Sequence, residues 1–533
     1  MALLIKNVLL PLTAEESSLQ QLAARALAMP QSCIHAMRVV RISTDARKKD
    51  EIVQLYSLRV EMDAADEVRV LKKSRPNIDR AAEEKLPEPE FGDTTMEAPP
   101  VVIGMGPAGL FAAYTLAKYG YKPVLIERGR PTQQRSEDVE AFCGGAALNP
   151  ESNVMFGEGG AGAFSDGKLM TRIKDPRAFS VLQTLAKFGG ADEILIQAKP
   201  HMGTDRLKNT VCAMRKEIER LGGEIHFNTK LRCIELQNGK ACAIVAEKSG
   251  ESLRFPCCAC ILAIGQGARD SYRMLLESGF VLQPKPFAVG VRIEHPRAMI
   301  DASQFGKWAG NPRLGAAEYH LSEQVNGRGV YTFCMCPGGV VIPSSSGAEQ
   351  VVTNGMSYFA RDAENSNAAI VVQVSPEDFG TEPLSGMLFQ EEIEKRAYYA
   401  GGGDFSAPAC RVGDFLSRKS TDGFGAVRPS YRPGVVRASM EDCLPDFVTE
   451  PLRAGVGAFG RRIRNYTMYD AVITAVESRT SAPVRIVRDQ NGEALGHSGV
   501  YPVGEGAGYA GGIVSAAVDG MRAAERILAI YKP

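Results

Sequence analysis

The sequence lacks a surplus of charge of either sign. Its 533 residues contain 62 Lys and Arg against 62 Asp and Glu, so the formal net charge is +0 at pH 7. A protein whose main partner is nucleic acid usually carries a basic surplus or a basic stripe. The short basic run at residues 47–49 is flanked by acidic residues and predicts a solvated loop. We therefore expect no nucleic-acid partner.

A long hydrophobic run is also missing. The most apolar stretch, Val101–Ala117, is interrupted by glycine and proline and is shorter than the roughly 20 residues that a membrane-spanning helix needs. The opening residues, MALLIKNVLLPLTAEE, contain neither a basic segment nor a small-residue cleavage site. They favour a folded strand over a signal peptide. We expect no membrane association and a cytoplasmic location.

Cysteine is present at ordinary abundance, with 12 residues in 533, which does not indicate a disulfide framework. Cys257, Cys258 and Cys260 contain a CxxC spacing, but they lie in an apolar strand pattern without a second ligand pair at zinc-site spacing. We expect no metal site. Reduced thiols in a reducing compartment are the better interpretation.

The chain is too long for one ordinary hydrophobic core, so two or three domains are expected. Residues 1–92 show the order strand, helix, strand, strand, which predicts a ferredoxin-like α/β module ending in a linker rich in proline and acidic residues. Residues 93–275 and 441–533 share an α/β pattern and predict one domain built from two parts. Residues 276–440 are richer in loops, glycine and aromatic residues, and they predict an inserted α+β substrate domain.

A dinucleotide-binding fingerprint lies at Val101–Gly129, where a strand, GxGxxG, a helix and a second strand follow one another. Gly104 permits a tight turn, Gly106 lets the backbone approach a pyrophosphate, and Gly109 lets the helix pack on the sheet. The helix N-terminus offers free N–H groups to phosphate. Glu127 ends the second strand, where its carboxylate can accept from ribose hydroxyls. The ligand is FAD or NAD, and this segment alone does not choose between them.

The C-terminal segment Gly499–Ala523 favours FAD. It reads as a short strand, then GEGAG, then a helix beginning near Gly512–Ile513. Glu505 could accept a hydrogen bond from a ribityl hydroxyl, and the helix would aim N–H donors at the flavin pyrimidine carbonyl. NAD has no group that needs this second, distant half-site. A buried strand ending at Ala263–Gly265 either returns the chain past the nucleotide or is simply one more buried strand, since its periodicity shows only that it is buried. The sequence therefore predicts an α/β fold with a Rossmann-type FAD-binding domain.

Several longer motifs carry a resemblance to a known family. They are ISTDARKK (42–49), NVMFGEGGAGAFSDGKLMTRIK (153–174), PFAVGVRIEH (286–295), YTFCMCPGG (331–339) and VESRTSAPVRI (476–486). With the fingerprint, they resemble the glutathione-reductase-like FAD oxidoreductases with two dinucleotide folds. Within these, the chain is similar to an uncharacterised family of bacterial FAD-dependent dehydrogenases with a small N-terminal α/β domain.

The resemblance implies a non-covalent FAD that passes hydride to or from a small-molecule substrate. It also implies that the glycine-rich segment near residues 159–168 contacts the flavin. Fingerprint, C-terminal segment and resemblance together assign to the cofactor Gly104, Gly106, Pro107, Ala108, Gly109, Glu127, Arg128, Gly159, Gly160, Ala161, Ser165, Asp166, Gly167, Lys168, Leu231, Ala263, Gly265, Gly504, Glu505, Gly512 and Ile513.

Two departures from the disulfide reductases of this superfamily stand out. Only Cys143 lies where those enzymes carry a CxxxxC redox pair, so a disulfide-exchange mechanism of that type is not expected. A second complete GxGxxG is also missing. If NAD(P)H is an electron donor, it must bind transiently or in a non-standard way.

Catalytic groups are weakly marked, and each candidate has a structural alternative. Lys168 is either a donor to the flavin or a surface lysine, and His295 is either an acid–base group or a buried structural histidine. Cys336, with Cys334, is either a redox thiol or a packing residue. Arg479 either binds a substrate carboxylate or forms an ion pair between domains.

Two other functions stay open at this point. The chain could be a flavin-containing binding or redox-sensing protein that docks a protein partner through its N-terminal module. A flavin-dependent tRNA-modifying enzyme is disfavoured by the neutral charge.

Overall fold

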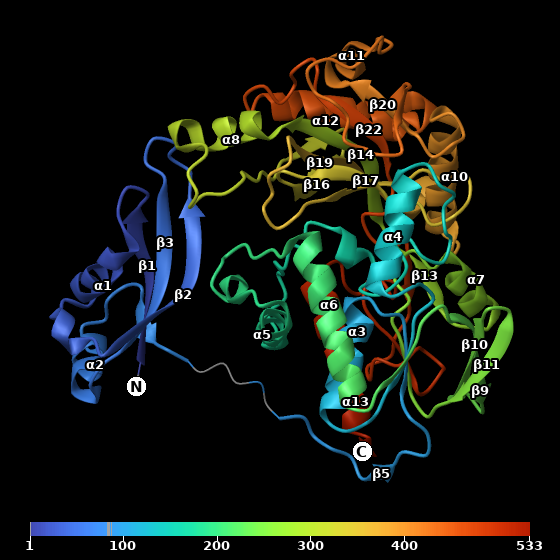
Figure 1. Ribbon diagram of the computed structural model, residues 1–533, viewed down its shortest axis with the longest axis horizontal. Helices are drawn as coiled ribbons and strands as arrows, with labels where there is room; N and C mark the ends of the chain where they lie inside the picture. Colours follow the sequence, from blue (N-terminus) through green and yellow to red (C-terminus); the bar gives the residue numbers. More distant parts are fainter. Residues whose placement is uncertain (1, 83–85, 87) are drawn as a thin grey trace.

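The computed structural model describes residues 2–82, 86 and 88–533. It contains three units, and in Figure 1 the dinucleotide-binding domain combines a cyan-to-green part with the red C-terminal segment. The blue N-terminal module stands to one side, the second domain lies at the top, and the dinucleotide-binding domain lies below it. None of the helices in the described residues is long and apolar enough to cross a membrane.

The N-terminal module has the element order β1 (Ala2–Pro11), α1 (Leu19–Leu27), β2 (Ala36–Asp45), β3 (Val53–Glu61), α2 (Ala64–Leu71), β4 (Ile78–Arg80). Its strands form an antiparallel sheet in the order β2-β3-β1-β4, the order of a ferredoxin-like sheet. Alternate residues of β3, Tyr56, Leu58 and Val60, are buried. They pack with Leu19, Ala23 and Leu27 of α1, because side chains two apart on a strand share one face.

The dinucleotide-binding domain is built on a parallel sheet of five short strands in the order β24-β12-β6-β7-β8. These are β24 (Val500–Pro502), β12 (Cys260–Leu262), β6 (Val101–Ile103), β7 (Val124–Ile126) and β8 (Glu224–His226). β6, β7, β12 and β24 are buried on both faces, as expected for a parallel sheet covered by helices. The sheet contains β24, so the C-terminal segment returns to the dinucleotide-binding domain, as the sequence predicted.

Helices and a small sheet surround this core. The helices are α3 (Pro107–Lys118), α4 (Thr132–Cys143), α5 (Arg177–Gly189), α6 (Gly203–Arg220), α7 (Arg269–Glu277) and α13 (Ile513–Leu528). Strands β9 (Lys230–Gln237) and β10 (Lys240–Lys248) form a hairpin around Asn238-Gly239, and β11 (Glu251–Pro256) pairs with β10. Both central turn residues have positive φ, as the Asn-Gly signal predicted.

The second domain contains a sheet of seven strands in the order β15-β16-β19-β14-β22-β20-β21. They are β14 (Phe287–Pro296), β15 (Ser322–Val325), β16 (Arg328–Cys336), β19 (Asn365–Val374), β20 (Ala407–Arg411), β21 (Val435–Arg437) and β22 (Val472–Glu477). A separate hairpin joins β17 (Val340–Pro343) to β18 (Thr353–Met356). The helices of this domain are α8 (Arg297–Phe305), α9 (Pro376–Phe379), α10 (Ser385–Ala400), α11 (Val412–Ser417) and α12 (Asp446–Gly460).

The sequence placed the end of this domain at about 440, and the structure differs. Strand β22 is fully buried and pairs with β14 on one side and β20 on the other. The domain therefore continues to about residue 480. The periodicity of a fully buried strand shows only that it is buried, and only the strand order shows which sheet it joins. Strands β13 (Leu282–Pro284) and β23 (Val484–Ile486) pair antiparallel, so the two connections between the domains run side by side.

The N-terminal module contacts both other units. Leu12 and Ile52 are buried within the hydrophobic core of the second domain, and Gln54 Nε2 donates to the Arg313 carbonyl at 3.2 Å. On the other side, the N–H of Ile42 donates to the carbonyl of Ile196 at 2.6 Å. Figure 1 shows the module reaching the second domain near α8.

We expect Ile52→Ala to loosen this docking. Ile52 is 2% exposed, so removing its side chain should cost about 2–5 kcal/mol of stability. Urea unfolding followed by the fluorescence of Trp308, the single tryptophan, reports this interface, since Trp308 Nε1 donates to the Asp50 carbonyl at 3.4 Å. Leu9→Ala, at a side chain 50% exposed, is the control and should change stability by about 0.5 kcal/mol or less. Equal transitions for the two variants would contradict the docking.

Candidate flavin site

A cavity of about 710 Å³ opens between the dinucleotide-binding domain and the second domain. It lies where β6, β7, β12 and β24 end, which is the edge at which open parallel sheets bind ligands. A volume of this size is in the range of cofactor sites. The second domain supplies the facing wall from β16, β18 and the residues that follow β22.

The residues expected to hold the cofactor converge on this cavity from three distant parts of the chain. The structure places on its wall Gly104, Gly106, Pro107, Ala108, Glu127, Arg128, Gly160, Ala161, Ser165, Asp166, Gly167, Lys168, Leu231, Ala263, Gly265, Gly504, Glu505, Gly512 and Ile513.

Two expected residues lie behind the wall. Gly109 packs α3 against β6, where a Cβ would lie 1.9 Å from the Gly104 carbonyl oxygen. Gly159 faces Val211 of α6, where an added Cβ would lie 3.3 Å from the Val211 Cγ2. Both glycines therefore shape the backbone around the cavity.

Two helices begin at the cavity. Gly106 precedes α3 and Gly512 precedes α13, and each helix leaves free N–H groups and a partial positive charge at this end. Among the described residues, a Cβ added at Gly265 or Gly511 would meet no atom within 4 Å, and a Cβ at Gly106 would meet only one, 3.9 Å away. The absence of side chains here leaves a cradle in which a ligand can approach the backbone. These features fit a dinucleotide.

Glu127 is buried, and the protein backbone occupies most of the acceptor positions of its carboxylate. Its carboxylate accepts from the N–H groups of Met105 at 2.8 Å and of Gly129 and Gly157 at 2.9 Å. A carboxylate has about four acceptor positions. One position is left for a ribose hydroxyl, whereas the sequence suggested that Glu127 accepts from both hydroxyls.

Glu505 lies on the cavity wall, where Gln266 Nε2 donates to its carboxylate at 3.0 Å. Burial raises the pKa of Glu505 to about 7, against a smaller lowering by Lys285. The group can therefore hold or release a proton near neutral pH.

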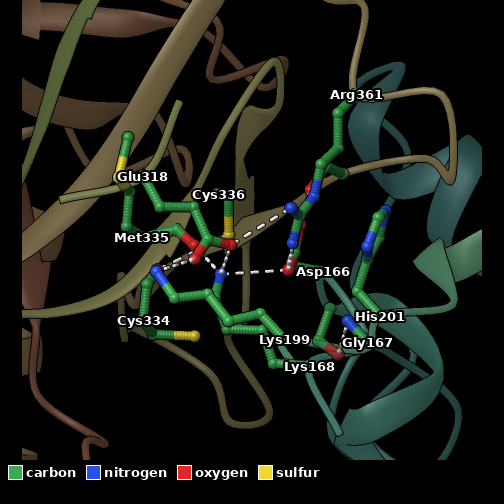
Figure 2. A network of polar contacts seen from close by, with 12 residues as sticks. Asp166, Gly167, Lys168, Lys199, His201, Glu318, Cys334, Met335, Cys336 and Arg361 are labelled. Carbon is green, nitrogen blue, oxygen red and sulfur yellow. Dashed lines mark hydrogen bonds and ion pairs between the residues drawn. The ribbon is translucent and has the colours of Figure 1, made fainter. Parts of the chain in front are cut away.

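A network of charges joins the glycine-rich segment to the second domain (Figure 2). Asp166 accepts from Arg361 Nε at 3.0 Å and Nη2 at 2.5 Å, and it pairs with Lys168 Nζ at 2.9 Å. Burial opposes ionisation, but the Lys168 and Arg361 cations outweigh it and lower the pKa of Asp166. Lys168 also donates to the Met335 carbonyl of β16. Lys168 is thus held in an ion cluster and is only 20% exposed.

The four catalytic candidates separate in space. Lys168 and Arg479 line the cavity, whereas His295 and Cys336 do not. His295 is fully buried with its Nε2 2.7 Å from the Tyr466 carbonyl oxygen, and burial lowers its pKa to about 4. Arg479 pairs with Glu394 through Nε at 3.0 Å and Nη2 at 2.9 Å. His295 is therefore a buried structural histidine. Arg479 forms an ion pair and also lines the cavity.

Sequence reasoning named Cys334 beside Cys336 but assigned no role in the site to the other residues of the facing wall. Tyr331, Phe333 and Cys334 come from β16, Asn354 from β18 and Glu477 from β22. Arg292 of β14 supports them from behind, since it pairs with Glu477 at 2.8 Å and donates to Asn354 Oδ1 at 2.8 Å. Asn354 lies outside the quoted motifs, and the motifs at 331–339 and 476–486 are far apart in the chain. The strand order brings them together.

Comparison with known proteins agrees with this division into units. Residues 99–279 match a family model described as pyridine nucleotide-disulphide oxidoreductase. Residues 286–480 match one described as FAD-dependent protein, C-terminal domain-like. Residues 4–61 match a domain of unknown function. An uncharacterised protein of Clostridium beijerinckii is 46% identical over 533 residues, which is 99% of each chain.

The chain belongs to the family of that clostridial protein. The matched models make it an FAD-dependent oxidoreductase, a flavoprotein with a Rossmann-type FAD-binding domain. Among solved structures, the flavin-dependent brominase Bmp2 aligns over 81% of each chain with 11% identity and a TM-score of 0.37. CtdE in complex with FAD aligns over 80% of this chain and 82% of its own, with 13% identity and a TM-score of 0.31.

We expect Gly511→Val to block FAD while leaving the fold intact. Gly511 lines the cavity, its φ is outside the left-handed region, and a Cβ there meets no atom of the residues that the structure describes within 4 Å. The valine side chain would occupy ligand space, so FAD should bind at least about tenfold more weakly, about 1.4 kcal/mol. Flavin content after dialysis measures the effect. Gly423→Val is the matched control, because Gly423 has equally open surroundings and lies outside the cavity wall. Full flavin content in Gly511→Val would place the cofactor elsewhere.

A second test uses the titration of Glu505 in FAD-free protein. Its folded-state pKa is raised from 4.5 to about 7, so folding favours the protonated acid. The resulting stability is complete below pH 4.5 and is lost as pH rises through about 7. Between about pH 4.5 and about pH 8, wild type should lose about 1–3 kcal/mol relative to Glu505→Gln, allowing for water in the cavity. Denaturation curves at both pH values measure this. Glu349→Gln, at a side chain 54% exposed, is the control. An equal change of stability with pH in wild type and Glu505→Gln would refute the raised pKa of Glu505.

Proposed function

We propose that the protein is a dehydrogenase or reductase that passes hydride through non-covalent FAD to or from a small-molecule substrate, with NAD(P)H as a transient electron donor. The observation that carries this proposal is the two-sided cavity. Dinucleotide-binding elements form one wall, and β16, β18 and Glu477 of the second domain form the other. A small molecule held against the second wall would share the cavity with the flavin.

The chain offers a partner for each part of FAD. The start of α3 at Gly106 would hold the pyrophosphate and Glu127 a ribose hydroxyl. Glu505 would accept from the ribityl chain, and the start of α13 at Gly512 would face the pyrimidine edge of the flavin. When bound, FAD supplies two-electron redox chemistry at its flavin ring.

The second wall offers hydrogen bonds to a polar substrate. The hydroxyl groups of Ser344 and Thr353 are buried at the cavity, and neither has a hydrogen-bond partner among the residues that the structure describes. Buried hydroxyls without partners are costly, so a ligand that pairs with them gains affinity. Arg479 lies on the same wall. We assign substrate orientation to these three side chains.

The visible spectrum of the purified protein tests the proposal. We expect two flavin bands that bleach after anaerobic addition of NADH or NADPH, because the cavity leaves the flavin accessible from the second domain. Gly511→Val reconstituted under the same conditions is the control and should show weaker bands. Flavin bands that dithionite bleaches, but that neither nucleotide nor any small organic substrate changes, would indicate a structural or sensing flavin instead.

A further inference from the structure

A distortion in β16 at the edge of the cavity contains Cys334 and ends at Cys336. The pairing of β16 with β19 shifts register between Phe333 and Cys336, which marks a bulge. Cys334, inside the bulge, has a φ of 41°, and it is the one cysteine among the described residues on the cavity wall. Cys336 lies fully buried behind it. Bulges of this kind re-aim a side chain, and here the bulge aims Cys334 at the ligand space.

Two cations hold this bulge. Lys168 Nζ donates to the Met335 carbonyl, and Arg292 Nη1 donates to the Cys334 carbonyl at 2.8 Å. Figure 2 shows Lys168 reaching from Asp166 to the Cys334–Cys336 segment. Hydrogen bonding to the Cys336 thiol, together with Arg292 and Lys168, lowers the pKa of the Cys334 thiol despite its burial. The same contact and burial raise the pKa of Cys336. One thiol is therefore suited to attack and the other to remain protonated.

The spacing allows the two sulfurs to join. Residues two apart in an extended strand have Cα atoms about 6.6 Å apart. Disulfides bridge Cα separations up to about 6.8 Å. The Cys336 Sγ already lies 3.5 Å from the Cys334 carbonyl oxygen, so its side chain leans toward Cys334.

We propose that Cys334 and Cys336 are a dithiol–disulfide pair that exchanges two electrons with bound FAD and reduces a small disulfide substrate. This proposal rests on the proposed function and names its substrate class. This pair differs from the CxxxxC pair of the disulfide reductases, which the sequence lacks. Cys143, which lies in the region of that pair, does not line the cavity. Here the second domain supplies both thiols.

In the reducing direction, the Cys334–Cys336 disulfide is the first electron acceptor. With two electrons from reduced FAD and one proton, the Cys334–Cys336 disulfide opens to a Cys334 thiolate and a Cys336 thiol. The thiolate attacks one sulfur of the substrate, whose S–S bond breaks, and the first half leaves and takes up a proton. Cys336 then loses its proton, attacks the Cys334 sulfur and re-forms the disulfide, and the second half leaves with that proton. In total, one disulfide, two electrons and two protons give two thiols.

Anaerobic reductive titration of the FAD-loaded full chain tests the pair. After air oxidation, wild type should consume about twice as much dithionite per flavin as Cys334→Ser or Cys336→Ser, because the disulfide takes a second electron pair. Cys233→Ser, in β9 and away from the cavity wall, should behave as wild type. Flavin content shows whether each variant folds. Equal uptake in wild type and both cysteine variants would overturn the pair.

Mass spectrometry after alkylation provides a readout independent of the flavin. The oxidised chain should yield a peptide in which Cys334 and Cys336 are linked to each other, and Cys334→Ser should leave Cys336 alkylated. Free thiols at both positions after oxidation would overturn the proposal. Dithionite replaces NAD(P)H here, so a chain that fails to accept electrons from nucleotides can still show the disulfide. Conversely, nucleotide bleaching without linked cysteines would leave the proposed function standing and remove this pair.

Discussion

The site depends on one buried carboxylate that is shared by two domains. Asp166 lies in the glycine-rich segment of the first domain, and its main partner, Arg361, belongs to the second. Removing charges from water costs several kcal/mol per ion, and that cost is offset only when the partners and hydrogen bonds are complete. Lys168 completes the cluster and continues it to β16. The glycine-rich segment must therefore stay seated against the second domain, which sets one wall of the cavity.

The division of roles within the site follows from this contact between the two domains. The dinucleotide-binding domain contributes backbone groups to the site. These are two helix N-termini and glycines that leave room for a ligand. The second domain supplies side chains, because its strands end at the opposite wall with thiol, amide, hydroxyl and carboxylate groups. Arg292, fully buried between β14 and its neighbours, orders several of them at once through Glu477, Asn354 and the Cys334 carbonyl. Cofactor binding and substrate choice are thus separated between the two domains.

Parts of the fold and the site were readable from the sequence because they are local. The fingerprint around Gly104 and the helix beginning at Gly512 each need only a few neighbouring residues to define a phosphate or flavin contact. The turn at Asn238-Gly239 is equally local. Other predictions failed where distant segments decide. The domain end at about 440 was wrong because β22 is inserted between β14 and β20. For His295 the sequence left two roles open, and the structure supports the buried structural one, because its strand is buried on both faces.

The sequence by itself determined that this protein is an FAD-binding α/β chain with a small N-terminal module and a second domain. Contiguous motifs and hydrophobic periodicity carry that information, because backbone geometry over a few residues dictates them. Only the tertiary structure decided which side chains face the flavin space. Lys168 proved to be part of an ion cluster, and Cys334 rather than Cys336 reaches the cavity. The reason is physical: burial and charge pairing depend on residues far apart in the chain, which meet only when the strand order of the second domain is set.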